Sequence, residues 1–108
     1  MTVTPRRKAF RITQGKGFHI TFENGWTVSV QFGGGNYCDN YDMLIGDEYE
    51  QAGEEGSNTA ECAVWGPDGD MVEYGDWGNT VSNRSTAAEV LTLLSWAAVQ
   101  CQDAEDDD

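Results

Sequence analysis

Residues 18–32 alternate apolar and polar side chains on both sides of a short polar turn, and this pattern constrains the fold more tightly than any other segment. Successive side chains of a strand point to opposite faces, so a period of two predicts two strands that each bury one face. The apolar members are Phe18, Ile20 and Phe22 before the turn, and Trp26, Val28, Val30 and Phe32 after it.

The turn at residues 23–25 sets the register of this hairpin. A two-residue Asn-Gly turn would pair Phe22 with Thr27 and place an apolar side chain opposite a polar one. A three-residue loop, in which a type I turn is followed by Gly25 in the left-handed region, pairs Phe22 with Trp26 instead. We therefore predict the three-residue loop and a hairpin with one wholly apolar face.

The Pro-Asp-Gly sequence at residues 67–69 predicts a second hairpin of the same kind, because proline suits the second turn position and glycine the left-handed one. If Gly66 pairs with Asp70, apolar residues meet on one face and the other face is only partly polar. The first face then holds Val64 with Val72 and Cys62 with Tyr74, and the second holds Trp65 with Met71 and Ala63 with Glu73.

A helix is predicted to close the domain, because Thr86 and Glu89 have the spacing of a capping box. We expect its buried stripe to consist of Ala87, Val90, Leu91, Leu94, Ala98 and Cys101, widened by Leu93, Trp96 and Ala97. The fold class is therefore α+β, with an antiparallel sheet of about four strands from two hairpins, covered on one face by the C-terminal helix.

One helix covers one face only, so the opposite face of the sheet is expected to be a polar surface with a hydrophobic corner. Its polar residues are His19, Thr21, Thr27, Ser29 and Gln31, and its corner is Trp65 with Met71.

The 108 residues fit one domain. We expect a basic, flexible arm at residues 1–15, a single α+β domain at residues 16–102 and a disordered acidic tail at residues 103–108; residues 9–13 of the arm are expected to add an edge strand. No apolar run reaches the ~18 residues that cross a bilayer, which predicts no membrane contact. Three widely spaced cysteines predict reduced thiols and a cytosolic protein.

Charge is segregated along the chain, whose formal net charge is −13. No acidic residue precedes Glu23, and after Lys16 the single cation is Arg84. The excess is well beyond the net charge of ~2 to 8 that solubility requires of a small domain. Two explanations are open: an acidic proteome of a salt-adapted host, and a surface that imitates a nucleic-acid backbone to occupy a basic groove. Both predict no direct binding of nucleic acid.

Acidic side chains and tyrosines coincide between the hairpins, in a long loop without periodicity. This is where we expect a basic partner to bind, whether by nucleic-acid mimicry or by simple charge attraction. The predicted contact residues are Tyr37, Asp39, Tyr41, Asp42, Asp47, Glu48, Tyr49, Glu50, Glu54 and Glu55.

Residues suited to catalysis or to metal binding are sparse. His19 is the single histidine, and Cys38, Cys62 and Cys101 lack the close spacing of a zinc site. Neighbouring carboxylates such as Glu54 and Glu55 share one solvated loop, which does not separate their pKa values as acid–base catalysis requires. We therefore expect no enzyme activity, no metal and no cofactor.

Residues 17–39, together with residues 63–74 (AVWGPDGDMVEY), resemble small proteins of unknown function encoded by bacteriophages and prophages. The two segments span residues 17–74, about half of the chain, and the resemblance brings no catalytic motif with it. Phage proteins of this size and acidity are similar in type to anti-CRISPR and other anti-defence inhibitors, which bind a host protein. The resemblance therefore implies a protein partner in the cytoplasm of the bacterial host.

Two hypotheses follow. In the first, the protein is a small inhibitor whose acidic loop docks on a basic surface of a host protein. In the second, it is an oligomeric module that sequesters a small nucleotide signal. Leu93 and Trp96 would then make a homodimer or larger oligomer, and Trp65 or Trp77 would stack on a base.

Overall fold

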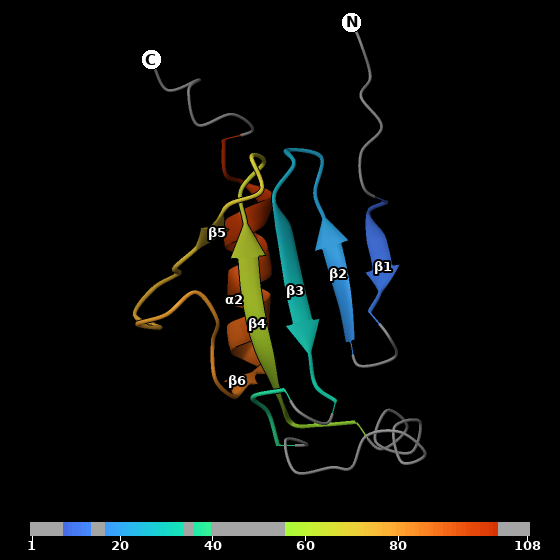
Figure 1. Ribbon diagram of the computed structural model, residues 1–108, viewed down its shortest axis with the longest axis vertical. Coiled ribbons are helices and arrows are strands. Elements are labelled where there is room, and N and C mark those ends of the chain that lie inside the picture. The colour runs from blue at the N-terminus through green and yellow to red at the C-terminus, as the bar shows by residue number, and fades with distance from the viewer. Residues whose placement is uncertain (1–7, 14–16, 34–35, 40–55, 102–108) are drawn as a thin grey trace, which may run out of the picture.

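The computed structural model describes residues 8–13, 17–33, 36–39 and 56–101. An antiparallel sheet of six strands packs against the C-terminal helix, so the α+β class is confirmed (Figure 1). The strands are β1 (Phe10–Ile12), β2 (Gly17–Thr21), β3 (Thr27–Gln31), β4 (Thr59–Trp65), β5 (Met71–Val72) and β6 (Ser85–Thr86), and the helix is α2 (Ala87–Ala98). The strand order is β1-β2-β3-β4-β5, and β6 pairs with β4. The count exceeds about four because β1, the expected edge strand, and β6 both join the sheet.

The first hairpin has the predicted register. Phe18 pairs with Val30 and Ile20 with Val28. The backbone N–H of Phe22 donates to the carbonyl of Trp26 at 2.9 Å, and Gly25 has a φ of 91°, as the three-residue loop requires.

Asn24 ties this turn to the far end of the chain. Its side-chain amide donates to the carbonyls of Ala97 and Gln100, both at 2.9 Å, while its oxygen accepts from the backbone of Trp26. The last carbonyls of a helix lack the usual partner four residues on, so Asn24 supplies a donor to Ala97 in the last turn and another to Gln100 just beyond the helix, and it holds α2 against the sheet.

The second hairpin is correct at its turn and wrong beyond it. Val64 pairs with Val72, and Trp65 pairs with Met71. The predicted partners of Cys62 and Ala63 are replaced: β5 ends at Val72, the chain leaves the sheet, and it returns so that Ala63 bridges to Val81. Gly75 and Gly78, with φ of 60° and 71°, lie in the excursion and permit its turns.

Helix α2 begins with the predicted capping box. The Thr86 hydroxyl accepts from the Glu89 backbone at 3.2 Å, and the Glu89 carboxylate accepts from the Thr86 backbone at 2.8 Å. The predicted buried stripe is wrong in part: Leu93 and Ala97 are the buried residues, with Val90, Leu94 and Trp96 packed beside them, whereas Ala87, Leu91, Ala98 and Cys101 are exposed. Apolar residues surround this helix, so several stripes fitted the sequence equally well.

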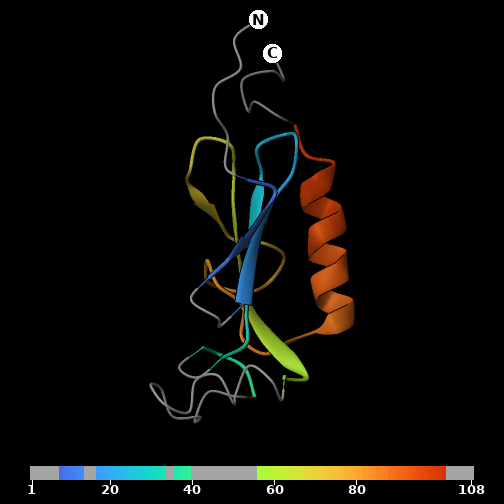
Figure 2. The same cartoon turned by 90° about the vertical axis from the view of Figure 1, so that its right-hand side faces the viewer.

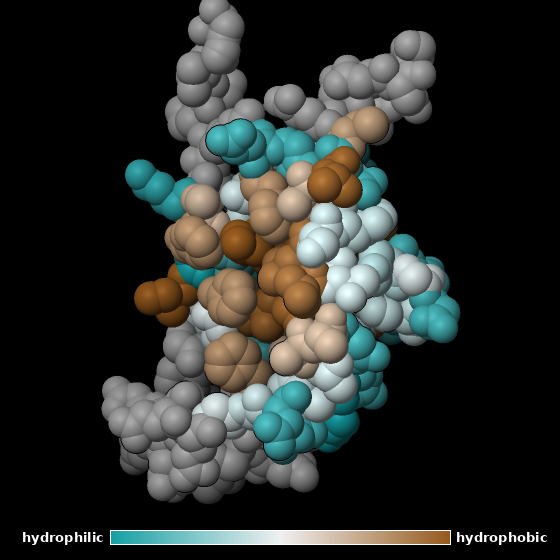
Figure 3. Space-filling model, turned by 180° about the vertical axis from the view of Figure 1, so that it is seen from behind, coloured by the Kyte–Doolittle hydropathy of each residue, from teal (hydrophilic) through white to brown (hydrophobic). Residues whose placement is uncertain are grey.

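The helix covers only part of its face of the sheet. It contacts β3, β4 and β6, and it stands on one side of the sheet (Figure 2). The core between the helix and the sheet consists of Val28, Val30, Ala60, Cys62 and Val64 from the strands, and Leu93 and Ala97 from the helix. Phe10 and Ile12 on β1 are 72% and 83% exposed, and Leu91 on the helix is 64% exposed. Apolar side chains therefore gather at the surface between β1, β2 and α2 (Figure 3).

The opposite face of the sheet is less open than predicted, because Thr27 and Ser29 are buried. His19 on β2 and Trp65 on β4 flank β3, and their ring centroids are 5.3 Å apart. The two rings therefore meet over β3 and shield its polar side chains. Arg11 extends this row from β1, with a guanidinium nitrogen 2.6 Å from His19 Nδ1.

Candidate functional site at the base of the acidic segment

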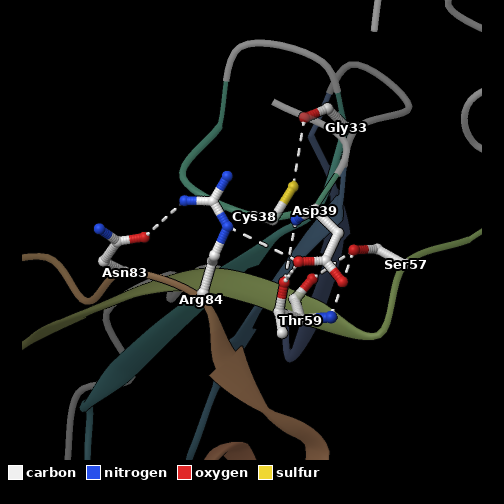
Figure 4. Close-up of polar contacts among 7 residues, drawn as sticks. All are labelled: Gly33, Cys38, Asp39, Ser57, Thr59, Asn83 and Arg84. Atoms are coloured by element: carbon white, nitrogen blue, oxygen red, sulfur yellow. Dashed lines mark hydrogen bonds and ion pairs between the residues drawn. The ribbon is translucent and has the colours of Figure 1, made fainter. Parts of the chain in front are cut away.

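Residues 36–39 follow β3 and form a compact turn at one end of the sheet. Cys38 anchors it: the side chain is fully buried, and its Sγ lies 3.6 Å from the Gly33 carbonyl (Figure 4). The backbone N–H of Asn36 also donates to Gly33, at 3.2 Å. With Cys38 fixed inward, its neighbours Tyr37 and Asp39 are exposed.

Asp39 and Thr59 join this turn to the start of β4. The backbone N–H of Asp39 donates to Thr59 Oγ1 at 2.9 Å, and that hydroxyl donates to Asp39 Oδ1 at 2.9 Å (Figure 4). The Ser57 hydroxyl donates to the Thr59 carbonyl at 2.7 Å and so fixes the backbone just ahead of β4. Residues 40–55, which we call the acidic segment, lie outside the described residues, and these hydrogen bonds hold together Asp39 before the segment and Thr59 after it.

Arg84 lies against the same pair. Its Nε is 3.6 Å from Asp39 Oδ1, its guanidinium donates to Asn83 at 3.1 Å, and its backbone N–H donates to the Tyr37 carbonyl at 2.9 Å (Figure 4). Both charged side chains are about half exposed, so the ion pair itself contributes at most ~1 kcal/mol. Its backbone φ of 54° places Arg84 in the left-handed region, which the surrounding hydrogen bonds hold.

Tyr37 is fastened by its backbone while its side chain stays 46% exposed. The backbone N–H donates to the Glu61 carboxylate at 3.0 Å, and the carbonyl accepts from Arg84. Tyr37 also lines a cleft of about 560 Å³ between the excursion after β5 and the first turns of α2. The other lining residues are Tyr74, Gly75, Asp76, Trp77, Gly78, Asn79, Val81, Ser82, Asn83, Ser85, Glu89, Thr92 and Leu93.

The structure brings together two of the ten predicted partner contacts, Tyr37 and Asp39, at the base of the acidic segment. The other eight lie outside the described residues: Tyr41, Asp42, Asp47, Glu48, Tyr49, Glu50, Glu54 and Glu55.

The four residues assigned to oligomer or ligand contacts do not form one site. Leu93 is 2% exposed in the core, a position that offers little surface to an oligomer contact. Trp96 packs against Trp26 and Tyr74, with ring centroids 5.3 and 4.9 Å apart. Trp65 packs against the His19 ring. Of these four residues, Trp77 and Leu93 line the cleft, and of those two Trp77 is the one that is partly exposed.

Thr59, Glu61 and Arg84 were missed by the sequence reasoning. Arg84 carried a signal, because it is the single cation after Lys16 and a lone cation in an acidic domain marks a place where charge must be held locally. Thr59 and Glu61 carried none, since their partners lie 20 and 24 positions earlier in the chain.

The thiols and the histidine lie in separate surroundings. Cys38 and Cys62 are buried and Cys101 is exposed. Burial raises the pKa of the Cys62 thiol to about 11, and hydrogen bonds with Ser82 and Ser85 partly oppose that rise. Across the described ranges, no three histidine, cysteine or acidic side chains converge as metal ligands would. In the same part of the chain, no helix has the length and apolar character to span a membrane.

Comparisons of this chain with protein-family models, with curated proteins and with solved structures found no match.

Proposed function

We propose that this protein is a small acidic inhibitor that binds a basic surface of a host protein in the bacterial cytoplasm. The observation that carries the proposal is the Asp39–Thr59 pair, which fixes the residue before the acidic segment against the start of β4, beside the exposed Tyr37. The acidic segment is therefore attached to the domain at this pair. The resemblance to phage proteins supplies the expectation of a host partner.

Charge supports this choice of partner. The acidic segment carries six carboxylates and no cation: Asp42, Asp47, Glu48, Glu50, Glu54 and Glu55. Arg84, the nearby cation, lies against Asp39 at the base. Clustered like charges steer a basic partner toward this end of the molecule and make association fast and salt-dependent. Binding, with no catalytic step, is the activity we propose.

The nucleotide-sequestering alternative is supported less well. Trp77 lines a cleft, as a base-stacking residue would, but Asp76 and Glu89 line the same cleft and repel phosphate groups. Leu93, which was to make the oligomer, is in the core.

The test compares two variants of equal net charge. In the first, Glu48, Glu50, Glu54 and Glu55 are changed to Gln; in the second, Asp103, Asp106, Asp107 and Asp108 of the tail are changed to Asn. Host proteins are captured on the unaltered protein at low and high salt, and association rates are then measured for the captured partner with both variants. We expect the first variant to bind at least about tenfold more weakly and the second to bind within about twofold of the unaltered protein.

Equal binding by all three proteins would refute the proposal, and so would equal weakening by both variants. The latter result would mean that net charge matters and the acidic segment does not. A captured partner whose binding did not change with salt would also count against it.

A further inference from the structure

The cleft beside Tyr37 has an unusual combination of walls. The aromatic residues Tyr37, Tyr74 and Trp77 line it together with the acidic residues Asp76 and Glu89. We propose that this cleft binds a guanidinium group, and that its natural occupant is an arginine side chain of the basic partner. The identity of that occupant rests on the proposed function, whereas the chemistry of the cleft can be tested alone.

The aromatic walls suit a flat cation. Tyr74 packs edge to face against Trp77, with centroids 5.6 Å apart, and lies 4.9 Å from the Trp96 ring. Tyr74 therefore packs between the rings of Trp77 and Trp96 and supports Trp77. A guanidinium placed over a tryptophan or tyrosine ring is attracted by the negative face of the ring, and more strongly where water is excluded.

The polar groups suit a cation with several donors. One Glu89 oxygen accepts from the Thr86 backbone at 2.8 Å, so the capping box holds this carboxylate in place at the cleft. Asp76 is exposed on the excursion across from the helix. Carboxylates accept two parallel N–H bonds from guanidinium. The two carboxylates carry the recognition, because the side-chain oxygens of Asn79 and Asn83 already accept from the Thr80 backbone and from the Arg84 guanidinium. An anion would meet like charge here.

The position of the cleft joins it to the proposed partner site. Tyr37 lines the cleft and stands two residues before Asp39, which directly precedes the acidic segment. The hydrogen bond from the Arg84 backbone to the Tyr37 carbonyl, 2.9 Å long, fixes that wall. A basic surface drawn to the acidic segment therefore has the cleft within reach of the same contact.

The direct test titrates the full chain with Nα-acetyl-argininamide, and in parallel with Nα-acetyl-citrullinamide, which has nearly the same shape and no charge. Binding is followed by the indole N–H resonance of Trp77, assigned with Trp77→Phe. We expect the arginine compound to shift this resonance in a saturable way and the citrulline compound to leave it unmoved. Asp76→Asn should weaken binding about fivefold or more, and Asp70→Asn, an exposed acid outside the lining, should leave it within about twofold.

Equal shifts with both compounds would overturn the proposal, as would equal weakening by Asp76→Asn and Asp70→Asn, which would indicate general charge attraction. A saturable shift with adenosine monophosphate, and none with the arginine compound, would overturn it in favour of a nucleotide site. If the arginine compound binds but the Glu48, Glu50, Glu54 and Glu55 variant retains its partner, the cleft stands and the proposed function fails; the reverse pair of results removes the cleft alone.

Discussion

Thr59 Oγ1 stands between two atoms of Asp39, accepting from its backbone N–H and donating to its carboxylate, each at 2.9 Å. The two residues are 20 positions apart, and one hydroxyl therefore joins the turn after β3 to the start of β4 with two hydrogen bonds. A valine has the same shape and can make neither bond.

Replacing Thr59 with Val should lower the free energy of unfolding by about 1–2 kcal/mol, because Asp39 loses both a donor and an acceptor partner. Urea unfolding measures this loss, and faster amide exchange at Asp39 locates it. Thr92→Val is the control, since the Thr92 hydroxyl bonds only to the Ala88 carbonyl one turn back and should cost less than about 0.5 kcal/mol. Equal losses for the two variants would contradict this assignment.

Thr86→Ala should destabilise the protein by about 1 kcal/mol, because it removes the hydroxyl that accepts from the Glu89 backbone at the start of α2. Ser95→Ala, at an exposed position inside the same helix, should be neutral or slightly stabilising. Thermal unfolding of both variants checks the contrast, and a Thr86→Ala protein as stable as the parent would show that the cap carries no weight.

Alanine substitutions at the glycines of the two hairpin turns should destabilise the protein to different extents. Gly25 and Gly69 both have left-handed φ, at 91° and 92°, so alanine should cost about 1 kcal/mol at each. A Cβ at position 25 would also lie 3.1 Å from the Pro67 side chain, whereas at position 69 it meets nothing within 4 Å. Gly25→Ala should therefore have the lower denaturation midpoint. The opposite order would mean that the two turns do not pack as described.

The raised pKa of Cys62 predicts a stability loss at alkaline pH. Burial moves this pKa from 9.0 to about 11, so the folded protein holds the thiol proton more tightly than the unfolded chain does. This contribution is complete below pH 9 and is lost as pH rises toward 11, at up to about 1.4 kcal/mol per pH unit. Cys62→Ala should be less stable at pH 8 and should decline less steeply above pH 9. Urea titrations at several pH values measure this difference. If the unaltered protein and Cys62→Ala lost stability equally above pH 9, the loss would not come from the Cys62 thiol.

Because α2 covers only part of the sheet, we expect the stability cost of truncating a strand residue to depend more on its burial beneath the helix than on the size of its side chain. Val28 is fully buried beneath the helix, while its cross-strand partner Ile20 is only partly buried. Val28→Ala should cost about 2 kcal/mol or more, and Ile20→Ala about 1 kcal/mol although it removes more atoms. Chemical denaturation decides between them, and a larger loss at Ile20 would show that its face is covered in solution.

Local rules predicted those parts of the fold that neighbouring residues determine. The register at Phe22 and Trp26 followed from alternation and from one glycine, and the capping box at Thr86 followed from spacing alone. These features depend on contacts within a few residues, where the sequence records both partners.

Long-range contacts account for what was missed. Val81 replaces Glu73 beside Ala63 because the chain leaves the sheet for eight residues and returns, and no local pattern marks the return. Thr27 and Ser29 are buried because rings from two other strands meet above them. At the candidate site, Tyr37 and Asp39 were predicted as partner contacts from composition, which stays a prediction, whereas the Thr59 hydroxyl that positions Asp39 could be found only in three dimensions.

Strand β1 begins and helix α2 ends at the same end of the sheet, and strand β4 begins beside Asp39 at the other end (Figure 1). Antiparallel pairing thus places the first and last described elements of the chain at the end of the sheet opposite Asp39 and Thr59. A fluorescent reporter joined ahead of β1 or behind α2 is therefore attached at the end of the domain away from the Asp39–Thr59 pair.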